Sequence, residues 1–281
     1  RVKGRGTCDN KGQLMTFVEA LRAWKTATGT LPVSVTILLE GEEEIGSPSL
    51  PAVLHDNAEI LSADHILLCD TSMWDAETPA ICTSVRGLLN ETVELRVADV
   101  DRHSGAFGGT AQDAALLMSK ALAGLTDADG HILVPGFYDD VTPVDSTLRD
   151  EWAALEGCNI DRLMALWAAP CLTVTGVSSG HVGPGHKSSI PATALAHLSF
   201  RLVGQQKPKK LRYALRQYLN AALPKGLEFK FTAEASVAPC SIPQDLPSIS
   251  SVRRALDAEW PNPTRLVGGA GTIPAVGMLY E

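Results

Sequence analysis

The sequence has no long apolar run, no closely spaced cysteine pair and no excess of basic residues. A membrane-spanning helix needs about 20 consecutive apolar residues, and the longest candidates here, such as residues 33–39, have only the length of a strand. The formal net charge of −8 argues against a nucleic-acid partner, because binding to phosphates needs a basic surface. We therefore expect a soluble protein that binds neither membranes nor nucleic acids.

The cysteines give no sign of a metal ribbon or a disulfide framework. None of the six belongs to a CxxC pair, which excludes a zinc ribbon and a thioredoxin-like motif. In a chain of 281 residues they fit buried, reduced thiols of a cytoplasmic protein better than disulfides. Residues 1–7 contain no signal peptide, and we expect the native N-terminus to lie elsewhere. The cysteines are Cys8, Cys69, Cys82, Cys158, Cys171 and Cys240.

The first part of the chain has the pattern of an α/β layer. Apolar residues at helical spacing predict an amphipathic helix over residues 12–28, and Gly29 supplies its C-terminal stop. Residues 33–39 form a β-branched and leucine run typical of a strand covered on both faces. Residues 49–58 predict a helix and residues 66–69 a second buried strand. This alternation indicates a largely parallel sheet.

The pattern changes after residue 90. Strands are predicted at 91–97, 171–177, 194–203 and 227–235, and helices at 111–125 and 209–223. Their order is that of a split βαβ, ferredoxin-like module. A further helix is predicted at 248–259. The predicted fold class is α/β: a catalytic domain with a mixed, largely parallel sheet at residues 1–86 and 238–281, interrupted by a ferredoxin-like α+β domain at 87–237. We place residues 140–169 as a helical excursion on the inserted domain.

Acidic residues follow both predicted strands of the catalytic domain. The segment Glu-Gly-Glu-Glu-Glu-Ile-Gly-Ser at 40–47 comes directly after residues 33–39, Asp70 ends the second strand, and Asp9 lies in a glycine-bracketed turn. Ligands collect at the carboxyl ends of strands, and adjacent carboxylates usually need a cation. A solvated acidic loop is the alternative. The three acidic sites can surround a pair of divalent metals, among which residue type alone does not choose.

Six motifs follow one another along the chain: GRGTCDNKG, EGEEEIGS, LLCDTSMW, DRHSGAFGG, PGFYDDV and SFRLV. Their order and approximate spacing resemble those of the M20 metallopeptidases, and the closest likeness is to the carnosinase-like and nonspecific dipeptidase branch. The resemblance covers essentially the whole chain and implies metal-dependent hydrolysis of the amide bond of dipeptides or short peptides by a metal-activated water. An N-acyl or N-succinyl amino acid deacylase is the alternative enzyme, and a non-catalytic binding module is the alternative of another class.

The resemblance assigns roles to the carboxylates. It implies that Asp9 bridges two divalent metal ions, with zinc expected and manganese or cobalt as alternatives. Glu44 would bind one ion and Asp70 the other, while Glu43 would act as general base. On the residues alone Glu42 competes with Glu43 for this role, and only the family pattern separates them.

The resemblance also assigns residues outside the carboxylate segments. A lone histidine is more often structural, but in this family the histidine at the place of His103 lies on the inserted lid domain and reaches the partner subunit's active site, where it stabilises an oxyanion. This implies a homodimer formed through the inserted domain. Arg201 would grip the terminal carboxylate of the substrate, together with the glycine-rich turn at Gly271 and Thr272. Ala270 and Thr272 replace a glycine and a serine of that turn.

Two metal-binding histidines of the family pattern have no counterpart in this sequence. One belongs to a His-x-Asp motif upstream of the first glycine-bracketed turn, and the other follows the glycine-rich turn. We therefore expect the sequence to lack both ends of the family pattern, and the 281-residue chain on its own to be inactive.

Overall fold

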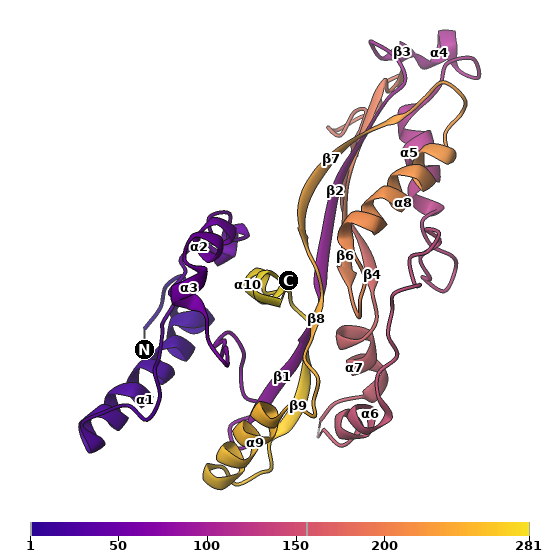
Figure 1. The fold of residues 1–281 in the computed structure, drawn as a ribbon. Helices are drawn as coiled ribbons and strands as arrows, with labels where there is room; N and C mark the ends of the chain where they lie inside the picture. The colour runs from indigo at the N-terminus through magenta and orange to yellow at the C-terminus, as the bar shows by residue number, and fades with distance from the viewer. Residues whose placement is uncertain (1, 156, 281) are drawn as a thin grey trace.

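The computed structural model describes residues 2–155 and 157–280. It contains two main sheets, and the chain passes from one to the other between β1 (Ala80–Val85) and β2 (Gly87–Arg96) (Figure 1). In the smaller sheet, β1 pairs in parallel with β9 (Arg265–Gly269) and antiparallel with β8 (Cys240–Ser241). The larger sheet is entirely antiparallel, with β6 (Thr193–Leu202) and β2 at its centre and β4 (Cys171–Ser179) and β7 (Phe229–Val237) at its edges. The predicted mixed α/β class is confirmed.

The larger sheet has the predicted split βαβ arrangement. Its elements follow the order β2, α5 (Ala114–Ala123), β4, β6, α8 (Pro208–Ala221) and β7, and its strands lie in the order β4-β6-β2-β7. Buried and half-buried residues alternate along β2, because successive side chains of a strand point to opposite faces. The buried face packs against the two helices, whose apolar residues complete one core.

One charged residue is buried in this core. The Glu91 side chain, on β2, is fully buried, and it accepts hydrogen bonds of 2.8 Å from the Nε atoms of Arg212 and Arg216. Both arginines belong to α8. A buried carboxylate is tolerated only when charge and hydrogen bonds are satisfied, so these contacts fix α8 against β2.

Two helices within residues 140–169 pack against the smaller sheet. They are α6 (Ser146–Ala153) and α7 (Ile160–Trp167), whose buried residues join a core with Leu266 and Val267 of β9. Asp140, before α6, instead contacts Gln205 and Lys210 of the inserted domain. Trp152 Nε1 donates to the carbonyl oxygen of Leu266 at 3.2 Å. The prediction of an excursion on the inserted domain is therefore wrong. The apolar faces of these helices cover β9, a strand that the sequence pattern did not reveal.

The N-terminal segment gives a mixed result. Helix α1 (Gly12–Thr28) spans the predicted residues, and α2 (Leu50–Asp56) and α3 (Ala58–Leu61) divide the second predicted helix. The predicted strands at 33–39 and 66–69 are wrong, since no strand is assigned to either. A strand needs hydrogen-bonding neighbours, and no described strand pairs with these residues. Val33 is 66% exposed and Leu67 67%, so the apolar runs remain uncovered.

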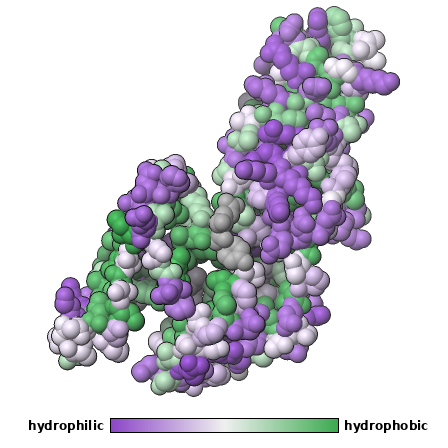
Figure 2. Space-filling view, viewed as in Figure 1, coloured by the Kyte–Doolittle hydropathy of each residue, from purple (hydrophilic) through white to green (hydrophobic). Residues whose placement is uncertain are grey.

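Figures 1 and 2 show the consequence for the molecule's surface. The N-terminal helices stand apart from both sheets, and hydrophobic side chains gather on this part of the surface.

The smallest sheet, formed by β3 (Arg102–His103) and β5 (Ser189–Ile190), lies with α4 (Ser104–Phe107) at the far end of the larger sheet. The remaining helices are α9 (Pro247–Glu259) and α10 (Pro274–Tyr280). No helix in the described residues has the length and apolar character needed to cross a bilayer.

Candidate active site

The acidic residues predicted to form the site come from three loops. Asp9 is exposed within η1 (Thr7–Lys11), and Glu43 and Glu44 open the short helix η2 (Glu43–Ile45). Asp70 is half-buried and accepts a hydrogen bond of 2.7 Å from Asn10 Nδ2. The first loop therefore contacts the third through this bond. It contacts the second through Arg5, whose Nη1 lies 2.6 Å from Glu44 Oε1.

The backbone after η2 turns sharply and separates the neighbouring glutamates. Gly46 and Ser47 have φ values of 86° and 53°, a region that most residues avoid. The turn brings the Ser49 N–H to Glu42 Oε2 at 3.0 Å. Glu42 therefore accepts a hydrogen bond at the start of α2, whereas the charge of Glu43 is affected by those of the other acids. This difference between adjacent glutamates is one that sequence reasoning could not supply.

The carboxylates lie close enough to affect each other's ionisation. Burial raises the pKa of Glu43 above its ordinary value, and the negative charges of Asp70, Glu44, Asp9 and Glu40 raise it further. Burial likewise raises the pKa of Asp70; the hydrogen bond from Asn10 opposes this shift, while Asp9 and Glu44 add to it. The negative charges of Asp9, Glu43, Glu44 and Asp70 therefore act on one another across the three loops.

The donor set fits a divalent cation in its chemistry. Asp9, Glu44 and Asp70 offer the oxygen ligands that such ions accept, and their mutual repulsion is the kind that a cation relieves. Within residues 2–155 and 157–280, however, no three His, Cys, Asp or Glu side chains are grouped as metal ligands. Arg5 and Asn10 supply the hydrogen bonds that Glu44 and Asp70 receive here. All six cysteines are free.

His103 does not join these acids within one chain. It lies on β3, at the opposite end of the molecule from the N-terminal helices (Figure 1), and it is exposed. Its Nδ1 accepts a hydrogen bond of 3.1 Å from the Gly105 N–H. In a neutral imidazole an accepting Nδ1 leaves the proton on Nε2. The ring therefore presents Nε2 as a hydrogen-bond donor.

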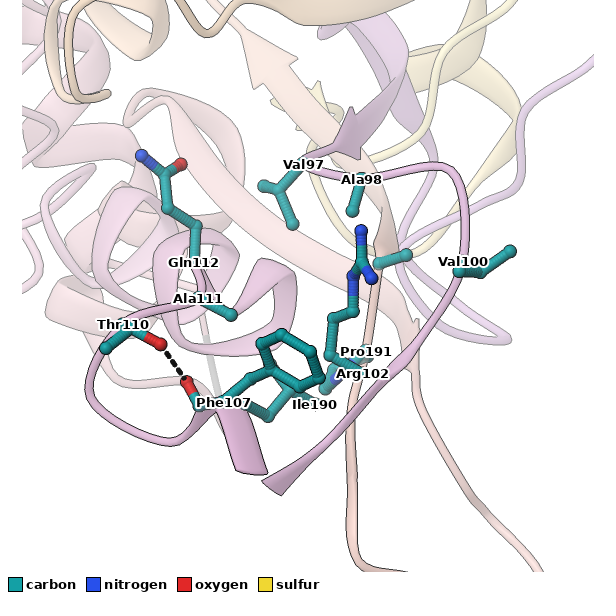
Figure 3. A pocket seen from close by; sticks show the side chains of 11 residues that line it. Val97, Ala98, Val100, Arg102, Phe107, Thr110, Ala111, Gln112, Ile190 and Pro191 are labelled. Carbon is teal, nitrogen blue, oxygen red and sulfur yellow. Dashed lines mark hydrogen bonds between the residues drawn. The ribbon is translucent and has the colours of Figure 1, made fainter. Parts of the chain in front are cut away.

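The loop around His103 is held by several contacts. Asp101 accepts hydrogen bonds from Ser189 Oγ at 3.1 Å and from the Ala192 N–H at 2.8 Å, which tie the loop to β5 and the residues after it. Arg102 lies over the Phe107 ring, 5.3 Å from its centroid. Both side chains line a pocket of about 300 Å³, which Figure 3 shows from close by. None of the predicted site residues lines this pocket.

A second cluster surrounds the glycine-rich turn between β9 and α10. Arg201, on β6, donates from Nη1 to Thr272 Oγ1 at 2.8 Å, and the Thr272 hydroxyl donates to the Arg86 carbonyl oxygen at 2.6 Å. Arg86 also donates from Nε to the Ala270 carbonyl oxygen at 2.8 Å. The predicted partners Arg201, Gly271 and Thr272 are thus brought together. Sequence reasoning missed Arg86, because a single arginine between two strands has no distinguishing pattern.

The glycines leading into the turn are required by close packing. A Cβ on Gly268 would lie 2.6 Å from Cβ of Trp167, and one on Gly269 would lie 3.0 Å from the Ser84 carbonyl oxygen. A Cβ on Gly271 would meet nothing within 4 Å. Close approach of the backbone is therefore needed along β9, and Ala270 is compatible with the turn.

Comparison with known proteins places these residues in a wider context. A sequence model of Peptidase family M20/M25/M40 matches residues 1–275. A Mus musculus protein named Beta-Ala-His dipeptidase is 30% identical over 256 residues, which are 84% of this chain and 52% of that protein. A Schizosaccharomyces pombe Cys-Gly metallodipeptidase is 28% identical over 240 residues, 78% of this chain and 50% of the relative.

Solved structures agree with the fold. Human carnosine dipeptidase 1 matches with a TM-score of 0.76 and 27% identity over 98% of this chain and 63% of that one. An M20 family metallo-carboxypeptidase from Sulfolobus solfataricus matches with a TM-score of 0.86 and 27% identity over 98% of this chain and 66% of that one. The chain spans between about half and two thirds of the length of these relatives.

Proposed function

Because the chain belongs to Peptidase family M20/M25/M40, we propose that the protein hydrolyses the amide bond of dipeptides or short peptides in a metal-dependent reaction. The observation that supports the proposal is the contact between the three acidic loops: Asn10 is bonded to Asp70 and Arg5 to Glu44, and the charges of Asp9, Glu43, Glu44 and Asp70 act on one another. Solvated acidic loops have no reason to cluster in this way, since their charges repel.

Asp9, Glu44 and Asp70 are the residues that would hold the metal ions, with zinc proposed and manganese or cobalt as alternatives. When bound, such ions acidify a water so that it can attack an amide at neutral pH. Glu43 takes the proton of that water and delivers it to the departing amine. A carboxylate suits this role because it can take the proton from the water and return it to the leaving amine.

His103 and the turn supply the other functions. The Nε2–H of His103 donates to the oxyanion of the tetrahedral intermediate, where a donor has its largest effect. Arg201 holds the terminal carboxylate of the substrate through its guanidinium, and Thr272 joins it when its hydroxyl turns from the Arg86 carbonyl oxygen to the carboxylate. The position of β3 far from the N-terminal helices supports a homodimer in which His103 serves the partner subunit's site.

We also propose the domain division and the cellular location. The catalytic domain comprises residues 1–86 and 238–281, and the inserted lid and dimerisation domain comprises residues 87–237. The start of β2 at Gly87 and the end of β7 at Val237 support these boundaries, while α6 and α7 return to pack on the smaller sheet. The free cysteines support a cytoplasmic location.

The test is a substrate panel assayed with the complete protein after addition of zinc, manganese or cobalt. The names of the relatives make Beta-Ala-His and Cys-Gly the first dipeptides to include, beside N-acetyl and N-succinyl amino acids. Hydrolysis of dipeptides that stops with a chelator supports the proposal. Hydrolysis confined to the acylated amino acids would identify a deacylase, and metal binding without any hydrolysis would identify a binding module.

A further inference from the structure

Arg86 occupies the single position between the two sheets. β1 ends at Val85 and β2 begins at Gly87, so Arg86 is where the chain leaves one sheet for the other. The return crossing lies against the same place: a Cβ on Gly87 would be 2.6 Å from the Val237 carbonyl oxygen and from the Pro239 nitrogen. Arg86 is only 8% exposed. Arginine side chains are rarely buried to this extent in proteins.

The contacts of Arg86 are concentrated on the glycine-rich turn. Its backbone N–H donates to the Gly271 carbonyl oxygen at 3.1 Å, and its own carbonyl oxygen accepts the Thr272 hydroxyl. Its Nε donates to the Ala270 carbonyl oxygen, and Nη1 lies 3.7 Å from Cys171 Sγ. Every residue from 270 to 272 is therefore held by Arg86, and Thr272 is held on its other side by Arg201.

Neither arginine at this turn has an acidic partner in the described residues. Three of the other half-buried arginines do: Arg212 and Arg216 pair with Glu91, and Arg253 pairs with Glu151. Arg265 is half-buried and, like Arg86 and Arg201, has no salt bridge within the described residues. Burial lowers the pKa of Arg86; Cys171 opposes this shift, and the positive charge of Arg201 adds to it. A guanidinium stays charged in proteins, so two neighbouring cations here lack a compensating anion. A buried charge without compensation is costly.

We propose that Arg86 is a positioning residue for a carboxylate-binding subsite: it fixes the turn at 270–272 so that Thr272 meets Arg201, and its charge adds to that of Arg201 in attracting the substrate's terminal carboxylate. This rests on the proposed function, in which Arg201 and Thr272 touch that carboxylate. The proposal restricts the substrate class to molecules with a free α-carboxylate, because a carboxamide at this place would leave both cations uncompensated.

The test compares a dipeptide with its C-terminal amide in the complete protein. We expect the wild type to prefer the free acid in kcat/KM. Arg86→Met should reduce this preference roughly tenfold or more, mainly through KM, because the Arg201–Thr272 pair loses its support and the subsite loses one positive charge. Arg86→Lys keeps the charge without the planar fork and should reduce the preference by less. Arg96→Met, which removes an exposed arginine at the end of β2, is the matched control and should leave the preference unchanged.

If Arg86→Met lost activity equally on the free dipeptide and on its C-terminal amide, Arg86 would only support the fold. This result would overturn the proposal. If Arg86→Met does not fold, Arg86→Lys decides, and a wild-type preference in that variant overturns the proposal. A binding measurement separates this result from the proposed function. N-acetylglycine and N-acetylglycinamide are titrated calorimetrically: an acid preference that depends on Arg86 supports the subsite even if no peptide is hydrolysed. Hydrolysis without any acid preference would remove the subsite and leave the proposed function standing.

Discussion

Arg201 and Thr272 meet across 2.8 Å, one on the central strand β6 and the other in the turn after β9. This hydrogen bond links the two sheets through side chains that are 71 positions apart. We expect Thr272→Ala to raise KM for a free dipeptide about tenfold or more with little change in kcat, because a hydrogen bond to a charged group is lost. Thr272→Ser keeps the hydroxyl and should stay near wild type. An unchanged KM in the alanine variant would remove the hydroxyl from substrate binding.

Glu91 gives a prediction about stability. Its fully buried carboxylate holds Arg212 and Arg216, and Glu91→Gln should lower the free energy of unfolding by about 3 kcal/mol, because two partly buried cations lose their anion. Glu94→Gln is the control on the same strand. Its bond to Lys230 is exposed and 3.4 Å long, so its loss should cost less than about 1 kcal/mol. If urea titration gave the same loss of unfolding free energy for Glu91→Gln and Glu94→Gln, the buried ion pairs of Glu91 would contribute no more than the exposed pair.

Asp75 gives a prediction about pH. The Glu77 N–H lowers the pKa of Asp75, burial opposes this shift, and the Thr78 hydroxyl and N–H lower the pKa further. A folded-state pKa below the unfolded value means that the stabilisation is present above the ordinary aspartate pKa and is lost as the pH falls through the folded value. Asp75→Ala should therefore lower Tm at pH 7, with a difference that shrinks in acid. Asp64→Ala, at an exposed aspartate, is the control. A Tm difference independent of pH would show that ionisation is not involved.

The larger sheet could be predicted from the sequence because its elements contain their own signals. β2 alternates between buried and half-buried residues, and α8 carries Leu211, Leu215 and Leu219 at helical spacing on its buried face. Local periodicity and element order are enough for such a module. The prediction failed where a strand depends on neighbours: residues 33–39 have strong strand propensity but pair with no described strand.

The site could be predicted only in part. Asp9, Glu43, Glu44 and Asp70 were singled out because acids after apolar runs or in a glycine-bracketed turn are visible in the sequence, and their roles came from the family resemblance. In the structure their charges act on one another. The roles of Arg5, Asn10 and Arg86 were not visible. Each acts through a contact between residues distant along the chain, such as the 184 positions that separate Arg86 from Ala270, and no local pattern marks such a contact.

The proposed dimer can be tested by mixing two inactive variants of the complete protein. His103→Ala and Glu43→Gln should each be nearly inactive alone. In a mixed dimer one site holds both defects and the other neither, if His103 serves the partner's site. Refolding the two together should restore about a quarter of wild-type activity, since half the dimers are mixed and each has one intact site. If His103 acts within its own chain, every site keeps a defect and no activity returns.

The central claim is that Glu43 is the base of a metal-dependent hydrolysis and not a metal ligand. The most direct measurement is the metal content and kcat of Glu43→Gln in the complete protein, by elemental analysis and a dipeptide assay on the same sample. We expect metal content near that of wild type and a kcat lower by roughly 10²–10⁴-fold, the usual contribution of a general base. Loss of metal would make Glu43 a ligand, and an unchanged kcat with full metal content would contradict the assignment of the base.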